Sequence, residues 1–282
     1  MSRIVYLNGS YVPEEEAKVS VFDRAFLFGD AVYEVTAVLD RRLVDFEAHL
    51  ARLDRSLKEI ALAPPLSHEA LRGLHDELTR RNGMDEGIVY LQISRGAADR
   101  DFAYPDPTRP TVVAFTQSRP LIANPHAETG VKVITIPDLR WKRRDIKSTS
   151  MLAQAMGKQE AKLKGAYEAW MVENGVVTEG TSSTAFIFDA QGVIRTQPMG
   201  HQILPGVTRM AILRLAALEG VGLEERPFDV AEALSAREAF MTAASAFVLP
   251  VVEIDGVGIG DGRPGPLARR FRELYLEEAR KA

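Results

Sequence analysis

The sequence predicts a mixed α+β protein of two domains, and three observations carry that prediction. Segments rich in strand-forming residues, many of them arranged as hairpins, are interspersed with segments that have helical three- and four-residue spacing, without the regular strand–helix–strand alternation of a parallel sheet. The chain has 282 residues, 46% of them apolar, which is enough to build two cores. A weakly periodic stretch that contains Pro120 predicts an interdomain linker at 119–129, between a small domain at 1–118 and a large one at 130–282.

The first domain is expected to begin with a hairpin, because Asn8-Gly9 is a strong turn signal between two β-rich segments. Apolar residues at three- and four-residue steps then predict two helices, with Ser67 as the N-cap of the second. Two more strands flank a long loop at 96–110, and loops of this length are often functional. The predicted elements are the hairpin 4–12, the strand 31–39, the helices 46–60 and 67–81, and the strands 87–95 and 111–117.

The second domain is expected to mix strands with four helices. A loop at 137–147 leads to a helix whose start could be capped by the hydroxyl residues of Ser148-Thr149-Ser150. Pro205-Gly206 precedes another helix, and Gly220 provides a natural stop for it. The predicted elements are the strands 131–136, 168–173, 184–189, 192–195, 238–242 and 247–254, and the helices 150–164, 207–219, one beginning near 230–232, and 265–279.

Composition excludes several classes of function. The formal net charge is −4, from 35 basic and 39 acidic residues, whereas bulk nucleic-acid binding needs a basic face. The absence of cysteine removes disulfides, zinc ribbons, iron–sulfur clusters and thiol nucleophiles, and no metal site is predicted. The longest stretch without a charged side chain, 239–252, is too short to span a bilayer. With no apolar leader at the N-terminus, we expect a soluble cytoplasmic protein that binds neither membrane nor nucleic acid.

Two segments contain candidate chemical groups. Lys147 lies at the end of a loop, immediately before a run of hydroxyl residues, and a lysine shielded from water can act as a nucleophile toward an aldehyde. Glu179 precedes a glycine and four consecutive hydroxyl residues, and a buried glutamate there could hold a protonated ring nitrogen. Taken singly, each also fits an ordinary surface loop or a polar turn.

Three further segments could bind an anion. Leu204-Pro205-Gly206-Val207-Thr208 leads into a helix whose first amides are free to hold a phosphate. The small residues of 241–246 would let backbone amides approach an anion closely. Arg52 lies one helical turn after His49 and could reach a phosphate with a charge-assisted fork. A plain loop–helix junction, a tight turn and a surface arginine are the simpler interpretations of the same three features.

These five segments, in this order, resemble the fold-type IV pyridoxal-phosphate aminotransferases, and most closely the D-amino-acid transaminases. The resemblance extends from Tyr6-Leu7-Asn8-Gly9 to Glu253-Ile254-Asp255-Gly256, which is nearly the whole chain. It implies a two-domain fold with pyridoxal 5′-phosphate bound between the domains. It also implies a homodimer whose active site is completed by loops of the partner, and a lysine in the large domain that forms a Schiff base with the cofactor.

The resemblance assigns roles to individual residues. Lys147 would be the catalytic residue, joined to the cofactor and shuttling the substrate proton, and Glu179 would bind the pyridine nitrogen. Leu204 would pack against the cofactor ring. The remaining cofactor-binding residues, most of them around the phosphate, would be Arg52, Ser182, Ser183, Gly206, Val207, Thr208, Ala243 and Ala244.

The substrate end departs from the family pattern at one position. Tyr33 and Val35 would line the pocket, together with Ser183 and Ala244. D-amino-acid transaminases have an arginine and, two residues later, a histidine that bind the substrate carboxylate. Here Arg100 keeps the charge, and Phe102 stands where the family has histidine. This replacement predicts weaker binding of dicarboxylic substrates or tolerance of less polar amines.

The expected activity is transfer of an amino group from a D-amino acid to a 2-oxo acid, in two half-reactions through pyridoxamine phosphate. Three other activities on the same scaffold remain open: a branched-chain L-amino-acid transaminase, an (R)-amine transaminase and an aminodeoxychorismate lyase. The Arg100 loop favours the D-specific class, and Phe102 is the feature that favours (R)-amines.

Overall fold

The computed structural model describes residues 2–281 and divides them into two compact units. The first contains residues 2–120 and Ile146–Ser150, and the second contains Leu121–Asp145 and Met151–Lys281. Lys147 thus packs with the first unit, although its place in the sequence lies within the range 130–282 assigned to the large domain.

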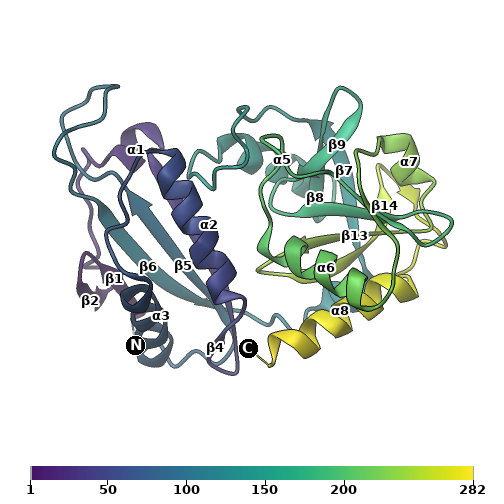
Figure 1. Ribbon diagram of the computed structural model, residues 1–282, viewed down its shortest axis with the longest axis horizontal. Helices are drawn as coiled ribbons and strands as arrows, with labels where there is room; N and C mark the ends of the chain where they lie inside the picture. The colour runs from purple at the N-terminus through teal and green to yellow at the C-terminus, as the bar shows by residue number, and fades with distance from the viewer. Residues whose placement is uncertain (1, 282) are drawn as a thin grey trace. The chain divides into compact units, whose positions relative to one another are not determined.

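The first unit is an antiparallel sheet with two long helices on one face (Figure 1). Val32, Val89 and Leu91 point toward the helices and form a core with the apolar faces of α2 and α3. Ser67 caps α3 as predicted, because its hydroxyl accepts a hydrogen bond from the amide of Ala70. The strand order is β2-β1-β6-β5-β3-β4, with β1 (Ile4–Leu7), β2 (Ser10–Pro13), β3 (Ala31–Leu39), β4 (Arg42–Leu43), β5 (Gly87–Ser94) and β6 (Thr111–Ser118), and the helices are α1 (Arg24–Phe28), α2 (Phe46–Glu59) and α3 (His68–Arg81).

The second unit is built on a mixed sheet whose central strands are buried along almost their whole length, as strands covered on both faces are. The strand order is β12-β11-β10-β13-β14-β7-β8-β9, with β15 beside β14. These strands are β7 (Val131–Pro137), β8 (Glu168–Glu173), β9 (Val176–Gly180), β10 (Thr184–Phe188), β11 (Ile194–Thr196), β12 (Leu223–Glu225), β13 (Glu238–Ala243), β14 (Phe247–Ile254) and β15 (Val257–Gly258).

Helices pack on this sheet at several points. Helix α5 packs on β7 and β8, whereas α6 and α8 pack on β13 and on each other. Figure 1 shows α8, in yellow, running beneath β13 and β14. The helices of the second unit are α4 (Pro125–Thr129), α5 (Leu152–Leu163), α6 (Val207–Leu218), α7 (Val230–Leu234) and α8 (Pro266–Ala279).

The structure differs from the predicted elements mainly in short segments. Helix α4 lies inside the predicted linker, where Asn124 caps it and Pro125 begins it. Helix α1 and strand β9 were not predicted, because segments of five residues are too short to display a period. Helix α5 begins at Leu152 and not at Ser150, and its N-cap Met151 makes no side-chain capping bond. Within residues 2–281, no helix combines the length and apolar character that crossing a bilayer requires.

Candidate active site

Lys147 is held in place by its backbone, which runs beside the start of β3. The amide of Tyr33 donates to the carbonyl of Lys147 at 3.0 Å, and the amide of Thr149 donates to the carbonyl of Ala31 at 3.0 Å. The Lys147 Nζ atom lies 4.1 Å from the centre of the Tyr33 ring. The first unit therefore brings two predicted site residues together, with the amine against an aromatic face.

The hydroxyl residues after Lys147 do not cap the next helix, so that expectation was wrong. The hydroxyl of Thr149 donates to the carbonyl of Gly29 at 3.1 Å, and Ser150 Oγ lies 3.5 Å from the same oxygen. Gly29 ends α1 with a φ of 66°, in the left-handed region. The run therefore ties the lysine segment to the end of α1, which gives Lys147 a second fixed point.

Arg52 is buried in a carboxylate pair that the sequence did not reveal. Its Nε and Nη2 donate to the two oxygens of Glu34 at 2.8 and 2.7 Å, a bidentate fork. Nδ1 of His49 lies 2.7 Å from the same carboxylate. Burial opposes ionisation of Glu34, but Arg52 and His49 outweigh it and hold the pKa of Glu34 well below its usual range. Burial also lowers the pKa of His49, so its ring favours the neutral form.

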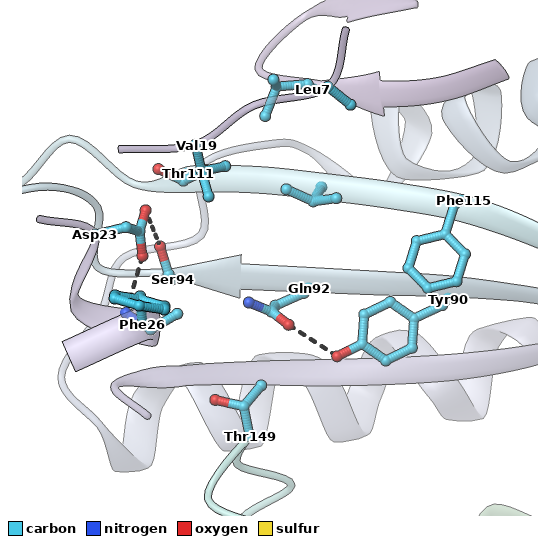
Figure 2. A pocket seen from close by; sticks show the side chains of 13 residues that line it. Leu7, Val19, Asp23, Phe26, Tyr90, Gln92, Ser94, Thr111, Phe115 and Thr149 are labelled. Carbon is cyan, nitrogen blue, oxygen red and sulfur yellow. Dashed lines mark hydrogen bonds between the residues drawn. The ribbon is translucent and has the colours of Figure 1, made fainter. Parts of the chain in front are cut away.

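The opposite face of the first sheet holds a cavity of about 390 Å³, within the size range of small-molecule sites (Figure 2). Tyr90 and Gln92 of β5 line it, and the phenol of Tyr90 donates to Gln92 at 2.8 Å. The Tyr90 ring stacks between those of Tyr33 and Phe115, at 5.5 and 4.9 Å between centres. Burial raises the pKa of Tyr90, which keeps its phenol protonated. Thr149 is also on the cavity wall, two residues from Lys147.

A buried arginine, Arg24, anchors the loop that contains Arg100 and Phe102. Nη1 of Arg24 donates to the carbonyl of Asp101 at 2.6 Å, and its Nε pairs with Asp30 at 2.7 Å. The Phe102 side chain is 78% exposed, and its ring lies 5.6 Å from that of Phe28. The guanidinium of Arg100 lies 5.4 Å from the Phe102 ring centre. The loop thus presents a cation and an aromatic ring from a fixed base.

In the second unit, Glu179 lies at the end of β9 and is 5% exposed. It forms an ion pair with Arg140, and its oxygens lie 3.2 and 3.3 Å from the amide of Leu204. Arg140 also pairs with Asp138 at 2.7 Å. Burial raises the pKa of Glu179, and Arg140 opposes that shift without cancelling it. Glu179 and Leu204, both predicted cofactor residues, are therefore in direct contact.

The hydroxyl residues after Glu179 bind a second buried carboxylate. Glu168 on β8 is fully buried and accepts hydrogen bonds from Thr181, from Ser182 at 2.8 Å and from Ser183 at 3.3 Å. Lys158 of α5 lies 3.6 Å from the same group. Ser182 and Ser183, predicted to bind cofactor, thus have a protein partner, which fixes the β9–β10 turn.

The start of α6 has the features of an anion site. Its N-cap is Gly206, which can offer no side chain to the first amides. The hydroxyl of Thr208 is buried and has no hydrogen-bond partner among the described residues, and the same holds for Thr242 on β13. A Cβ at Gly206 would lie 2.9 Å from the hydroxyl of Thr184, a residue of β10 that stands opposite Thr242 in the register of β10 and β13. A side chain at Gly206 would therefore crowd the place where the start of α6 meets β10.

Sequence reasoning missed the buried partners of the residues that it found. Glu34 carried a usable signal, because it is an acidic residue inside an otherwise apolar strand. Arg140 and Glu168 carried none, since each looks like an ordinary charged residue of a loop or a strand start. The missed residues that contact predicted site residues are Arg24, Glu34, His49, Tyr90, Arg140 and Glu168.

Comparison with known proteins identifies the family of this chain. Residues 31–254 match the family Amino-transferase class IV. A D-alanine aminotransferase of Staphylococcus aureus is 38% identical over 274 residues, covering 96% of each chain. One from Bacillus licheniformis is 40% identical over 270 residues, covering 95% of this chain and 94% of that protein.

Solved structures give the same fold. The branched-chain aminotransferase of the archaeon Thermoproteus uzoniensis, crystallised with norvaline, has a TM-score of 0.86 and 28% identity. It is matched over 99% of this chain and 95% of its own. The Escherichia coli branched-chain enzyme has a TM-score of 0.90 at 24% identity, over 98% of this chain and 94% of its own.

The chain belongs to the class IV aminotransferase family. The predicted fold class, a two-domain fold-type IV enzyme, is confirmed, and so is the prediction of an aminotransferase.

Proposed function

We propose that this protein is a D-amino-acid:2-oxo-acid transaminase that uses pyridoxal 5′-phosphate. The observation that carries the proposal is its 38 to 40% identity, over nearly the whole chain, to two D-alanine aminotransferases. Each unit, taken by itself, adds groups that the reaction needs: the first holds a fixed lysine, and the second holds a buried carboxylate and an anion site.

The residues present fit this cofactor. A phosphate would accept hydrogen bonds from the first amides of α6 and from the buried hydroxyl of Thr208, which has no partner among residues 2–281. Glu179 would accept a hydrogen bond from the pyridine nitrogen, and Leu204 would lie against the ring. When bound, the cofactor supplies an aldehyde that condenses with amines and a ring that withdraws electrons from the substrate α-carbon.

Each protein group then has a distinct task. Lys147 Nζ takes the proton from the substrate α-carbon and later returns one, acting as a base and then as an acid at a single atom. The Tyr33 ring, 4.1 Å away, limits where that amine can move. Arg140 opposes the effect of burial on the pKa of Glu179 and so favours the ionised carboxylate, which is the form that would hold a protonated ring nitrogen.

The substrate carboxylate would be bound by Arg100, with Tyr33 and Val35 lining the pocket. We infer a homodimer in which the exposed 96–110 loop of one chain serves the active site of the partner. Phe102, on the loop, is 78% exposed, and Phe26, next to it, is 74% exposed. These rings support the assembly because exposing apolar surface to water is unfavourable and a partner chain would bury it. Location in the cytoplasm stays a prediction.

The test is a substrate panel with purified enzyme and added cofactor. D-alanine with 2-oxoglutarate should yield pyruvate, whereas L-leucine and (R)-1-phenylethylamine should be poor donors. The cofactor joined to Lys147 should absorb at about 410 nm, and Lys147→Ala should abolish that band together with turnover. Absence of the band from the wild-type protein would refute the proposal.

A branched-chain L-amino-acid transaminase is the second candidate, favoured by the 28% identical Thermoproteus uzoniensis enzyme. Activity with L-leucine and none with D-alanine would establish it. Product formed without any 2-oxo acid would instead indicate a lyase.

A further inference from the structure

The turn between β13 and β14 contains a backbone conformation that its sequence does not favour. The amide of Ala246 donates to the carbonyl of Ala243 at 3.1 Å, and Phe247 follows with a φ of 60°. Three-residue hairpin connections of this kind need a left-handed residue at this point, and glycine usually supplies it. A phenylalanine is strained there, so other contacts must hold it.

Arg272 on α8 makes those contacts. Its Nη1 donates to the carbonyls of Ala246 and Val248, both at 3.0 Å, which are the two residues on either side of Phe247. Its Nη2 donates to the carbonyls of Leu121 and Ile122 at 2.7 and 3.1 Å. One side chain therefore fixes the turn to the beginning of the second unit.

The Phe247 ring is held by the same helix. It is fully buried, and its centre lies 5.2 Å from the ring of Tyr275, one turn beyond Arg272. Helix α8 thus controls both the backbone and the side chain at the strained position.

The charge of Arg272 is unusual for a buried residue. The side chain is 7% exposed, and in the described chain it has no carboxylate within ion-pair distance, only carbonyl partners. Burial lowers the pKa of this guanidinium. The charge of Glu128 opposes that shift without cancelling it, and a buried cation with this little compensation favours a further anion close by. The turn that it holds contains Ala243 and Ala244 and follows Thr242, whose buried hydroxyl is unpartnered among residues 2–281.

We propose that Arg272 is a positioning residue for the cofactor phosphate: it keeps the 243–247 turn in the conformation that lets the turn bind the phosphate. This inference rests on the proposed function. If Arg272 only stabilised the fold, its loss would weaken the binding of ligands with and without a phosphate to the same extent, and the two roles can be told apart on that basis.

The experiment compares pyridoxal phosphate with pyridoxal, which has the same ring and aldehyde but no phosphate. Arg272→Met and Arg272→Lys are prepared with Arg269→Met as the matched control, an exposed arginine on the same helix. The rate at which each holoenzyme loses its Lys147-dependent absorbance on dialysis is recorded, and both ligands are then titrated back. Thermal unfolding of the cofactor-free proteins reports the fold separately.

We expect Arg272→Met to raise the Kd of pyridoxal phosphate at least tenfold and to change the Kd of pyridoxal less than twofold. Arg272→Lys should give intermediate values, and Arg269→Met should give those of the wild type. An equal loss of affinity for both ligands would mean that Arg272 only stabilises the fold, and this would overturn the proposal. Unchanged affinity for pyridoxal phosphate would overturn it too. If Arg272→Met does not fold, the same ratio measured on Arg272→Lys decides. A wild-type protein that binds no cofactor would refute the proposed function. Failure of the Arg272 proposal is a different result, because there the wild type binds cofactor and only the comparison among variants fails.

Discussion

Two buried glutamates of this protein are paired with arginines, yet their pKa values shift in opposite directions. Glu34 receives a bidentate fork from Arg52 and a further contact from His49, and its pKa falls. Glu179 shares Arg140 with Asp138, and its pKa rises because burial outweighs the divided charge. The like charge of Asp138 also raises the pKa of Glu179, whereas both neighbours of Glu34 lower its pKa, so the surroundings of each carboxylate, more than the presence of an arginine, decide which effect wins.

Replacing Arg140 tests this account of Glu179. In Arg140→Met the effect of burial stands unopposed, so the pKa of Glu179 should rise further. Since the ionised carboxylate is the active form in this proposal, the acidic limb of kcat/KM against pH should move to higher pH. Arg140→Lys keeps a charge and should recover part of the shift. An identical pH profile in wild type and Arg140→Met would contradict the role of this pair.

Breaking the other pair should cost stability. Glu34→Gln leaves Arg52 buried without its carboxylate, and removal of one partner of a buried ion pair typically costs about 3–5 kcal/mol. Chemical denaturation at pH 7 measures the loss. The double variant Glu34→Met/Arg52→Met removes both charges and should be less destabilised than Glu34→Gln; a larger loss in the double variant would show that the pair is not the cause.

The same pair gives the unfolding free energy a defined dependence on pH. The pKa of Glu34 is lower in the folded protein than its ordinary value of 4.5, so its contribution is present above that pH and is lost as the pH falls below it. His49, with a lowered pKa, acts in the same direction from its ordinary 6.5 downward. Both groups therefore lower the free energy of unfolding as the pH falls.

Arg100 provides a prediction about substrate affinity. Arg100→Ala should raise the KM for D-alanine by about tenfold or more, because one charge-assisted contact to a carboxylate contributes about 1.5–3 kcal/mol. The absorbance of the bound cofactor should not change, since Arg100 is assigned to substrate only. Arg109→Ala, an exposed arginine of the same loop, is the control. Unchanged kinetics in Arg100→Ala would remove this residue from the site.

At the scale of elements, the contact between the end of α1 and the lysine segment can be tested with glycines. A Cβ at Gly29 would lie 2.5 Å from the hydroxyl of Ser150, at a φ of 66°. Gly83, after α3, has a φ of 57° but open space around it. Both alanine variants therefore carry backbone strain of about 1 kcal/mol, but only Gly29→Ala should also displace the segment of Lys147.

Thermal unfolding and the Lys147-dependent absorbance measure the two effects separately. Gly29→Ala should lower both, whereas Gly83→Ala should lower only the unfolding midpoint. Adding Ser150→Ala to Gly29→Ala removes the oxygen in contact and should restore the absorbance. If Gly83→Ala impaired cofactor binding equally, the contact with Ser150 would not be the cause.

Long elements were predictable from the sequence and short ones were not. Helices α2 and α3 were found because two or more turns of apolar spacing define a face, and Ser67 marked a start. Helix α1 and strand β9 depend on contacts from distant parts of the chain, such as the bridge between Val176 and Asp229. No local pattern reports a contact of that kind.

The predicted site divides along similar lines. Residues such as Lys147, Glu179 and Thr208 stand in motifs that a family resemblance can match in order. Their supports, including Arg140 and Arg272, are single charged residues whose partners lie far away in sequence. A hydroxyl run is equally ambiguous, because the sequence cannot say that Ser182 turns toward Glu168. Burial decides these cases, and burial is a property of the folded chain.

At the scale of the whole molecule, the distribution of exposed apolar residues bears on assembly. In the first unit, Val21, Phe22 and Phe26 are each more than half exposed, as are Phe102 and Tyr104 of the neighbouring loop. The amide of Ala98 donates to the carbonyl of Phe22 at 3.3 Å, so the two segments form one surface. Contiguous exposed apolar surface of this kind is typical of an interface.

If this surface forms the homodimer, Phe26→Ser should weaken it. Burying a phenylalanine contributes about 1.5–3 kcal/mol, so the Kd of the dimer should rise about 10- to 100-fold. Sedimentation of wild type should show twice the 31.1 kDa mass of one chain, and the variant should shift toward the single chain on dilution and lose turnover in parallel. Leu163→Ser, a 77% exposed position on α5, is the matched control and should change neither property. A Phe26→Ser protein that stays dimeric at wild-type dilution would place the subunit interface elsewhere, and the exposed rings beside Arg100 would then need another partner.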